Sequence, residues 1–285
     1  MMPDRFQHQR FELKYIVTES LALAVREFVS GYLELDEFGA TLPNYSYPVH
    51  SLYLDSNNLH TFRTTITGDK NRFKLRLRYY DERPGTPIFF EIKRRMNTII
   101  LKERGGVKRA SVRTLLSGQL PCGDDLFSNR PSHMTGLQRF LQLMNELNAA
   151  PRVHVSYMRE AWISQHDNSI RVTLDRQVQC DLDGAARLDT QSINPVTVFK
   201  GMVILELKFT NRFPDWFNHL VATFGLQQGG AAKYAEGVQL LGEDRVRRIS
   251  AMGSRIPETA ISAPVKVENA KPATIGSLSA LAPAT

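Results

Sequence analysis

The sequence predicts an α+β fold in which antiparallel β-structure forms the centre and helices lie outside it. Charged and apolar residues alternate with period two in at least five segments, and three other segments carry apolar residues at helical spacing. No long linker or internal repeat interrupts residues 5–250, so we expect one domain there. Residues 251–285, rich in Ala, Pro, Ser and Thr, are expected to form a disordered low-complexity tail.

Each alternating segment predicts a strand with one charged and one apolar face, because successive side chains of a strand point to opposite sides. The clearest example is residues 73–79, where Lys74, Arg76 and Arg78 alternate with leucine and aromatic residues. The same pattern occurs in residues 11–15, 88–93, 171–175 and 203–209.

The helical segments have recognisable starts. Thr18 is placed to cap a helix whose apolar face runs from Leu21 to Val29, and a second apolar stripe covers residues 137–147. A third helix is expected to begin near Pro214, since proline suits the first helical turn. Gly105 and Gly106 are expected to form a hairpin turn, because the chain has no phosphate-binding GxxxxGK[ST] motif.

Composition limits the classes of function. The formal net charge of +7 and the pI of about 9.5 favour anionic partners. Cys122 and Cys180 are too few for a disulfide framework or a cysteine-rich zinc site, which fits a reducing compartment. With no apolar signal segment and no window of 18 apolar residues, the chain is expected to be soluble and cytoplasmic, without a transmembrane segment.

The charged strand faces need an explanation. Residues two apart on a strand are roughly 7 Å apart, where like charges repel by about 2 kcal/mol at an effective dielectric of ~20. A solvated outer face would explain one such segment, because salt screens it. Five segments favour a closed sheet whose charges line a lumen, and a cationic lumen requires an anionic ligand.

The residues expected in this lumen suit phosphate and a hard metal ion. Arginine offers bidentate hydrogen bonds and lysine point charges to phosphate, while carboxylates suit Mg²⁺ or Mn²⁺. The ten basic candidates are Lys14, Lys74, Arg76, Arg78, Lys93, Lys102, Arg159, Arg171, Lys208 and Lys233, and the four carboxylates are Glu12, Glu91, Asp175 and Glu206.

A series of short motifs in order resembles the bacterial VTC-domain proteins, polyphosphate polymerase domains of the triphosphate tunnel metalloenzyme (CYTH-like) superfamily. The resemblance covers about residues 5 to 240. Its motifs are RFELKY at 10–15, SLYLDS at 51–56, KLRLRYY at 74–80, FFEIKRR at 89–95, LKER at 101–104, SYMREAW at 156–162, IRVTLDR at 170–176, ILELKF at 204–209 and KYAEGV at 233–238.

This resemblance implies a closed, eight-stranded antiparallel tunnel flanked by helices, in which ATP and inorganic polyphosphate bind. The implied enzyme transfers a phosphoryl group from ATP to the polymer and releases ADP. Glu206 would be the principal ligand of Mn²⁺ or Mg²⁺, with Glu91 the next candidate. The phosphate-binding catalytic residues would be Lys14, Arg76, Arg78, Lys93, Lys102, Arg159, Arg171, Lys208 and Lys233. Lys74 is a further phosphate-binding candidate.

Alternative functions remain open. A tripolyphosphatase or nucleoside triphosphatase would use the same fold, although Arg10 stands where the superfamily often has the first glutamate of ExExK. A non-catalytic polyphosphate- or nucleic-acid-binding protein is the third possibility. Nucleic acid is disfavoured, because it gives Glu91 and Glu206 no role. If the polymer leaves the cytoplasm, a separate membrane protein is expected as partner. Strand parity also leaves Arg152 as a lesser alternative to Arg159.

Overall fold

The computed structural model describes residues 10–165, 169–210 and 212–253. The strands are β1 Arg10–Thr18, β2 Glu34–Leu35, β3 Ser46–Asp55, β4 Asn71–Tyr79, β5 Ile88–Met96, β6 Ile99–Val107, β7 Ala150–Ile163, β8 Ile170–Leu182, β9 Val196–Thr197 and β10 Met202–Thr210. The α-helices are α1 Glu19–Ser30, α2 His60–Ile66, α3 Val112–Leu116, α4 Pro131–Glu146, α5 Asp215–Thr223, α6 Lys233–Leu241 and α7 Glu243–Gly253. Beyond α7, the expected tail lies outside the described residues.

All of these strands belong to one antiparallel sheet, with the order β2-β7-β3-β4-β5-β6-β1-β10-β8-β9. Because β7 also pairs with β8, eight strands follow one another in a cycle of pairings, and β2 and β9 are attached to it. Most pairings extend over many residues, but in the described chain β1 meets β6 only at Arg10 and Ile100. The predicted α+β class with a large antiparallel sheet is confirmed. The expected closed tunnel of eight strands is not, because the sheet has ten strands and the ladder between β1 and β6 is almost absent among the described residues.

The five alternating segments all lie in strands, namely β1, β4, β5, β8 and β10, as predicted. Their apolar rows pack outward against helices. Leu75 and Leu77 of β4 and Phe90 of β5 are fully buried beneath α4, where Phe90 meets Phe140 edge to face at 5.0 Å. Burying each such side chain contributes about 1.5–3 kcal/mol. The charged rows consequently occupy the opposite, inner face of the sheet.

The prediction of a hairpin turn at Gly105 and Gly106 was wrong, because both lie within β6. A Cβ at Gly105 would be 2.6 Å from the carbonyl oxygen of His133, and one at Gly136 of α4 would be 2.7 Å from that of Arg104. These glycines thus allow α4 to approach the backbone of β6 closely, a use of glycine that strand periodicity does not reveal.

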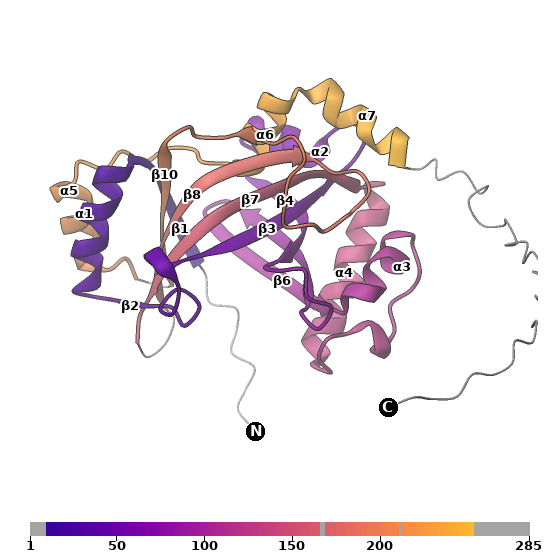
Figure 1. Ribbon diagram of the computed structural model, residues 1–285, viewed down its shortest axis with the longest axis horizontal. Coiled ribbons are helices and arrows are strands. Elements are labelled where there is room, and N and C mark those ends of the chain that lie inside the picture. Colours follow the sequence, from indigo (N-terminus) through magenta and orange to yellow (C-terminus); the bar gives the residue numbers. More distant parts are fainter. Residues whose placement is uncertain (1–9, 166–168, 211, 254–285) are drawn as a thin grey trace, which may run out of the picture. The chain divides into compact units, whose positions relative to one another are not determined.

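Helices α1 and α5 cover the sheet around β1, β8 and β10, on the side opposite α3 and α4 (Figure 1). Thr18 caps α1 as predicted, since its hydroxyl accepts a hydrogen bond from the Leu21 amide at 3.3 Å. Pro214 directly precedes α5, one residue from the expected start.

The end of β3 is held by α2 and α6. The Asp55 carboxylate accepts the Thr61 and Phe62 amides at 2.9 and 3.0 Å and the Tyr234 hydroxyl at 2.8 Å. Tyr234 also stacks on Tyr53 with ring centroids 4.7 Å apart. These contacts fix the start of α6, and with it the position of Lys233.

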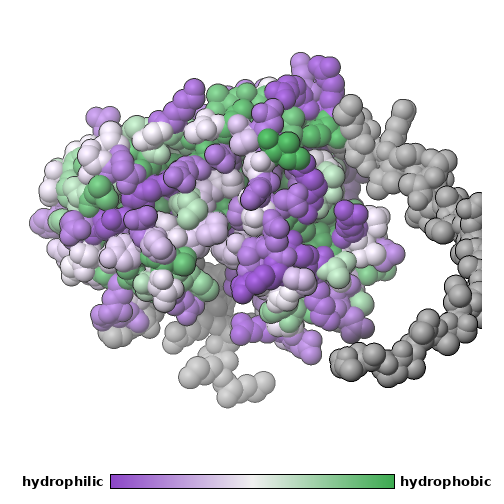
Figure 2. All heavy atoms as spheres, viewed as in Figure 1, coloured by the Kyte–Doolittle hydropathy of each residue, from purple (hydrophilic) through white to green (hydrophobic). Residues whose placement is uncertain are grey.

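Hydrophilic side chains cover much of the visible face of the domain, with smaller hydrophobic patches between them (Figure 2). Among the described residues, none of the helices has both the length and the apolar character required to cross a membrane.

Candidate functional site

Glu206 of β10 lies in a buried group of ion pairs on the inner face of the sheet. Its Oε1 is 3.3 Å from the Lys14 ammonium of β1 and 3.2 Å from the Lys233 ammonium of α6. Its Oε2 is 2.6 Å from the Lys208 ammonium and 3.6 Å from the Arg159 guanidinium of β7. One carboxylate is thus shared by four cations from four different elements.

Asp175 of β8 extends this group on one side. Arg159 donates to both carboxylate oxygens at 2.7 Å, and the Lys233 ammonium is 2.6 Å from Oδ2. Since Asp175 is fully buried, these charge-assisted hydrogen bonds satisfy a carboxylate that water does not reach.

Glu12 of β1 extends the group on the other side. Its oxygens lie 3.1 Å from the Lys14 ammonium and 2.8 Å from that of Lys93 on β5. Strand β6 separates β1 from β5 in the sheet order, so this pair spans the position where β1 and β6 hardly pair.

Glu91 of β5 anchors a second cluster. Arg76 of β4 donates to one carboxylate oxygen through Nε and Nη2, at 2.9 and 2.7 Å, and Lys102 of β6 is 2.5 Å from the other. Arg76 also donates to the Tyr53 hydroxyl at 3.3 Å. Lys102 is the more exposed cation, with 44% of its side chain accessible.

Lys74 and Arg78, which flank Arg76 on β4, have no carboxylate partner among the described residues. Arg78 is only 5% exposed, yet its Nε has no hydrogen-bond partner there. The buried Ser51 hydroxyl, directly opposite on β3, likewise has none. Buried polar groups are usually satisfied, so these two unpaired groups are unusual for a protein interior.

Tyr157 of β7 connects the clusters. Its ring centroid lies 4.9 Å from the Lys233 ammonium, 5.1 Å from the Arg159 guanidinium and 5.9 Å from that of Arg78. Such cation–π contacts stabilise positive charge without neutralising it. The ring therefore adds no negative charge beside these three cations.

Electrostatics keeps the carboxylates ionised. Burial opposes their ionisation, but the surrounding cations outweigh it and hold the pKa of Glu12, Glu91 and Glu206 below the ordinary value. Burial lowers the pKa of Lys74 to about 7, and the neighbouring cations act in the same direction. Burial also lowers the pKa of Lys208 to about 8, although Glu206 opposes the shift.

A family model for the VTC domain matches residues 9–242 of the chain. The chain belongs to the VTC domain family. The match spans both ion-pair clusters, from Glu12 to Lys233. A search of curated proteins finds no significant relative.

Solved structures show only distant similarity to this VTC domain. A putative adenylate cyclase from Bacillus halodurans has a TM-score of 0.44 and 12% identity, covering 79% of this chain and 94% of the other. The PH1819 protein from Pyrococcus horikoshii has a TM-score of 0.41 and 12% identity, covering 82% and 99%. The Mediator head module of Schizosaccharomyces pombe has a TM-score of 0.34 and 9% identity, covering 82% and 94%. These TM-scores are too low to establish a shared fold.

The VTC domain brings together most of the basic residues that the sequence singled out. Arg171 of β8 lies at the edge of the group, where its guanidinium is 2.8 Å from the Asp36 carboxylate and 3.2 Å from the Tyr47 hydroxyl. Arg152 lies elsewhere: it is fully buried and donates to the backbone carbonyls of Asp55 and Arg247. Of the two alternatives, Arg159 is the one that joins the inner face.

Asp36 and Tyr157 were not among the site residues expected from the sequence, and one contact of Glu12 was not expected either. Asp36 follows a two-residue strand, and no sequence pattern connects it with Arg171. Tyr157 shares strand parity with Arg159, so its place on the inner face could have been inferred. Glu12 was expected on this face, but its closeness to Glu206 depends on the pairing of β1 with β10.

The carboxylates of this VTC domain would hold a metal ion only together with oxygens from a bound phosphate substrate. In the described part of the chain, no three His, Cys, Asp or Glu residues gather as a metal site. Glu12 and Glu206 nevertheless share the Lys14 ammonium, at 3.1 and 3.3 Å. One or two carboxylates plus substrate phosphates is the usual protein environment of Mg²⁺.

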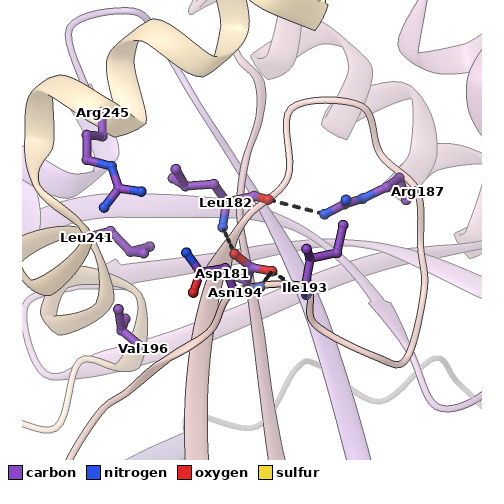
Figure 3. A pocket seen from close by; sticks show the side chains of 8 residues that line it. All are labelled: Asp181, Leu182, Arg187, Ile193, Asn194, Val196, Leu241 and Arg245. Atoms are coloured by element: carbon purple, nitrogen blue, oxygen red, sulfur yellow. Dashed lines mark hydrogen bonds between the residues drawn. The ribbon is translucent and has the colours of Figure 1, made fainter.

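A surface cavity of about 250 Å³ lies apart from the ion-pair clusters, between α6, α7 and the segment that follows β8 (Figure 3). Arg187 and Arg245 stand on different sides of it. Asp181 accepts the Ile193 and Asn194 amides at 2.8 and 3.1 Å, so this carboxylate serves the loop. None of the cations of the two clusters lines the cavity.

Proposed function

We propose that this VTC domain is a polyphosphate polymerase, which transfers the terminal phosphoryl group of ATP to inorganic polyphosphate and releases ADP. The observation that carries the proposal is the gathering of basic side chains from β1, β4, β5, β6, β7, β8, β10 and α6 around only a few carboxylates. Membership of the VTC domain family supports it.

The ion pairs of the free protein support phosphate binding by the same cations. Carboxylate oxygens at 2.6–2.7 Å from Lys208, Lys233 and Arg159 hold the cations in place before a ligand arrives. Phosphate oxygens make the same charge-assisted hydrogen bonds, bidentate with arginine. A phosphate chain thus joins cations that are already oriented, and Lys74 and Arg78 gain their first anionic partner.

The proposed reaction balances without a protein nucleophile. A terminal oxygen of the polyphosphate attacks the γ-phosphorus of ATP, a new P–O bond forms, and the bond from the γ-phosphorus to the β–γ bridging oxygen breaks. The electron pair of that bond leaves with ADP. Phosphoryl transfer of this kind depends on positioning and charge stabilisation, which arginines such as Arg76 and Arg159 provide.

Mg²⁺ or Mn²⁺ belongs to the same proposal. Glu206 is the proposed principal ligand, because it lies among the phosphate-binding cations, and Glu91 is the second candidate. Glu12 is a further candidate beside Glu206, since the two carboxylates share Lys14. When bound, the metal ion supplies neutralising charge to phosphate oxygens.

A tunnel is part of this proposal as well. The order of strand pairings supports it, although β1 and β6 pair only at Arg10 and Ile100 in the described chain, and the ion pair between Lys93 and Glu12 links the strands on either side of β6. A linear phosphate chain suits such a channel, because its charges repeat along one line.

Incubation with ATP, a short polyphosphate primer and Mn²⁺ tests the function. We expect one ADP to be released for each phosphate added to the polymer, with little free phosphate. Arg76→Ala should abolish the polymer, whereas Arg113→Ala, at an exposed arginine of α3, should not. Free phosphate without polymer would indicate a triphosphatase instead, and binding of polyphosphate without turnover would indicate a non-catalytic protein.

A further inference from the structure

Two like-charged residue pairs stand next to each other across β4 and β5. Lys74 lies opposite Lys93, and Arg72 lies opposite Arg95. Like charges directly opposite each other in an antiparallel pair are destabilising. Burial lowers the pKa of the Arg72 guanidinium, and the charge of Arg95 lowers it further, so these two side chains act on each other.

Strand geometry places Arg72 and Arg95 in line with the proposed phosphate site. Residues two apart share a face, so Arg72 continues the inner row of Lys74, Arg76 and Arg78. Exposure rises along this row, from the buried Arg78 to the half-buried Lys74 and Arg72, and Arg95 is exposed. The row therefore runs from the interior of the site to its rim.

Neither rim arginine is neutralised among the described residues. Arg72 donates to the Asp69 carbonyl oxygen, and Arg95 donates to the Asn97 carbonyl oxygen at 2.8 Å. These neutral acceptors orient the guanidinium groups. Neither guanidinium forms an ion pair there, and the nearby charge of Asp69 opposes the lowering of the Arg72 pKa only in part. Four cations thus face one another in two consecutive pairs on this face of β4 and β5.

We propose that Arg72 and Arg95 form an outer subsite for the polyphosphate chain, outside the residues that bind the reacting phosphates. The seven residues from Arg72 to Arg78 span about 20 Å of strand, which exceeds the length of a triphosphate group. A tripolyphosphate held at Arg76 and Arg78 does not reach the rim, whereas a long chain does. The subsite rests on the proposed function, and it makes affinity depend on chain length.

The double variant Arg72→Ala/Arg95→Ala tests the subsite by comparison of tripolyphosphate with long-chain polyphosphate in binding titrations at several salt concentrations. The control is Arg113→Ala/Arg139→Ala, which removes the same charge from the exposed Arg113 of α3 and the half-buried Arg139 of α4. We expect the rim variant to bind long chains about tenfold more weakly and with a smaller salt dependence, because about two phosphate contacts are lost. Its affinity for tripolyphosphate should remain within about twofold of wild type.

The possible results separate the two proposals. Equal loss of long-chain affinity in the rim and control variants overturns the outer subsite, as does a wild-type protein that binds both ligands equally tightly. Both results leave the proposed function intact. Failure of the wild-type protein to bind either ligand overturns the proposed function and the subsite with it. A thermal melt of the ligand-free rim variant at or above the wild-type temperature shows that the fold is retained.

Discussion

Lys74 lies directly opposite Lys93 on the inner face of β4 and β5, but only Lys93 has a carboxylate partner, Glu12, at 2.8 Å. In the described residues, the Lys74 ammonium has an aromatic neighbour, the ring of Tyr234 at 6.0 Å, and no counter-ion. Burial together with the charges of Lys14, Lys93, Arg72 and Arg76 lowers its pKa to about 7. This lysine is consequently a point where protonation and anion binding are coupled.

Binding of tripolyphosphate should take up a proton at Lys74. A bound polyanion favours the ammonium form and raises its pKa, so affinity should fall as pH increases from about 7 to about 9. The pH dependence of folding has the opposite sign. Above about pH 7 the Lys74 side chain binds more protons in the unfolded chain than in the folded protein, so its contribution to the free energy of unfolding increases with pH. Calorimetric titrations in buffers of different ionisation enthalpy measure the uptake, and Lys74→Arg should remove most of it. Undiminished uptake in Lys74→Arg would assign the proton to another group, with Lys208 the next candidate.

Arg76 and Arg78 provide a matched pair of substitutions on one strand. Both variants to alanine should weaken tripolyphosphate binding at least about tenfold, because each loses a guanidinium from the site. Only Arg76→Ala should destabilise the free protein, by about 2 kcal/mol, because Glu91 then keeps Lys102 alone as partner. Arg78→Ala should melt at or above the wild-type temperature, since Arg78 has no carboxylate partner to lose. Thermal melts with and without ligand measure the stability of both variants. A large destabilisation by Arg78→Ala would show that Arg78 has a structural role.

Glu206→Gln should affect stability and metal use together. The carboxylate is shared by Lys14, Lys208, Lys233 and Arg159, so loss of its charge should lower the melting temperature of the free protein. Bound tripolyphosphate should reduce the difference in melting temperature between Glu206→Gln and the wild type, because it supplies negative charge to the same cations. Turnover at limiting Mn²⁺ should fall strongly. Glu27→Gln, on the exposed face of α1, is the control; an unchanged metal dependence in Glu206→Gln would transfer the metal role to Glu91 or Glu12.

The close contact of α4 with β6 predicts a stability effect away from the site. A Cβ at Gly136 would be 2.7 Å from the Arg104 carbonyl oxygen, so Gly136→Ala should cost about 1–3 kcal/mol of unfolding free energy. Gly85→Ala should be neutral or slightly stabilising, because nothing lies within 4 Å of its added methyl group. Urea denaturation measures both, and equal stability of the two variants would contradict the packing described for α4.

Much of this fold was predictable because strand periodicity has a direct physical cause. The alternation from Phe73 to Tyr79 predicts both β4 and its charged face, and Thr18 marks the start of α1 through its side-chain hydrogen bond. Gly105 was misinterpreted, because a glycine that admits a neighbouring helix looks in sequence like a glycine that permits a turn.

The site was less predictable than the strands. Parity places Glu12 and Glu206 on an inner face, but their common contact with Lys14 depends on strand register between segments far apart in the chain. Arg72 continues the row of Lys74, but it precedes the alternating segment of residues 73–79, so the pattern does not indicate it. Asp36 has no periodic signal at all, since its role arises from the loop that places it beside Arg171.

A crystal structure with bound tripolyphosphate would show whether the inner cations bind a linear phosphate chain. We expect phosphate oxygens within hydrogen-bond distance of Arg76, Arg78 and Arg159, with at least one carboxylate ion pair of the free protein broken. Tripolyphosphate bound only on the outer surface, with the pairs of Glu206 and Glu91 intact, would show that these cations do not form the binding site.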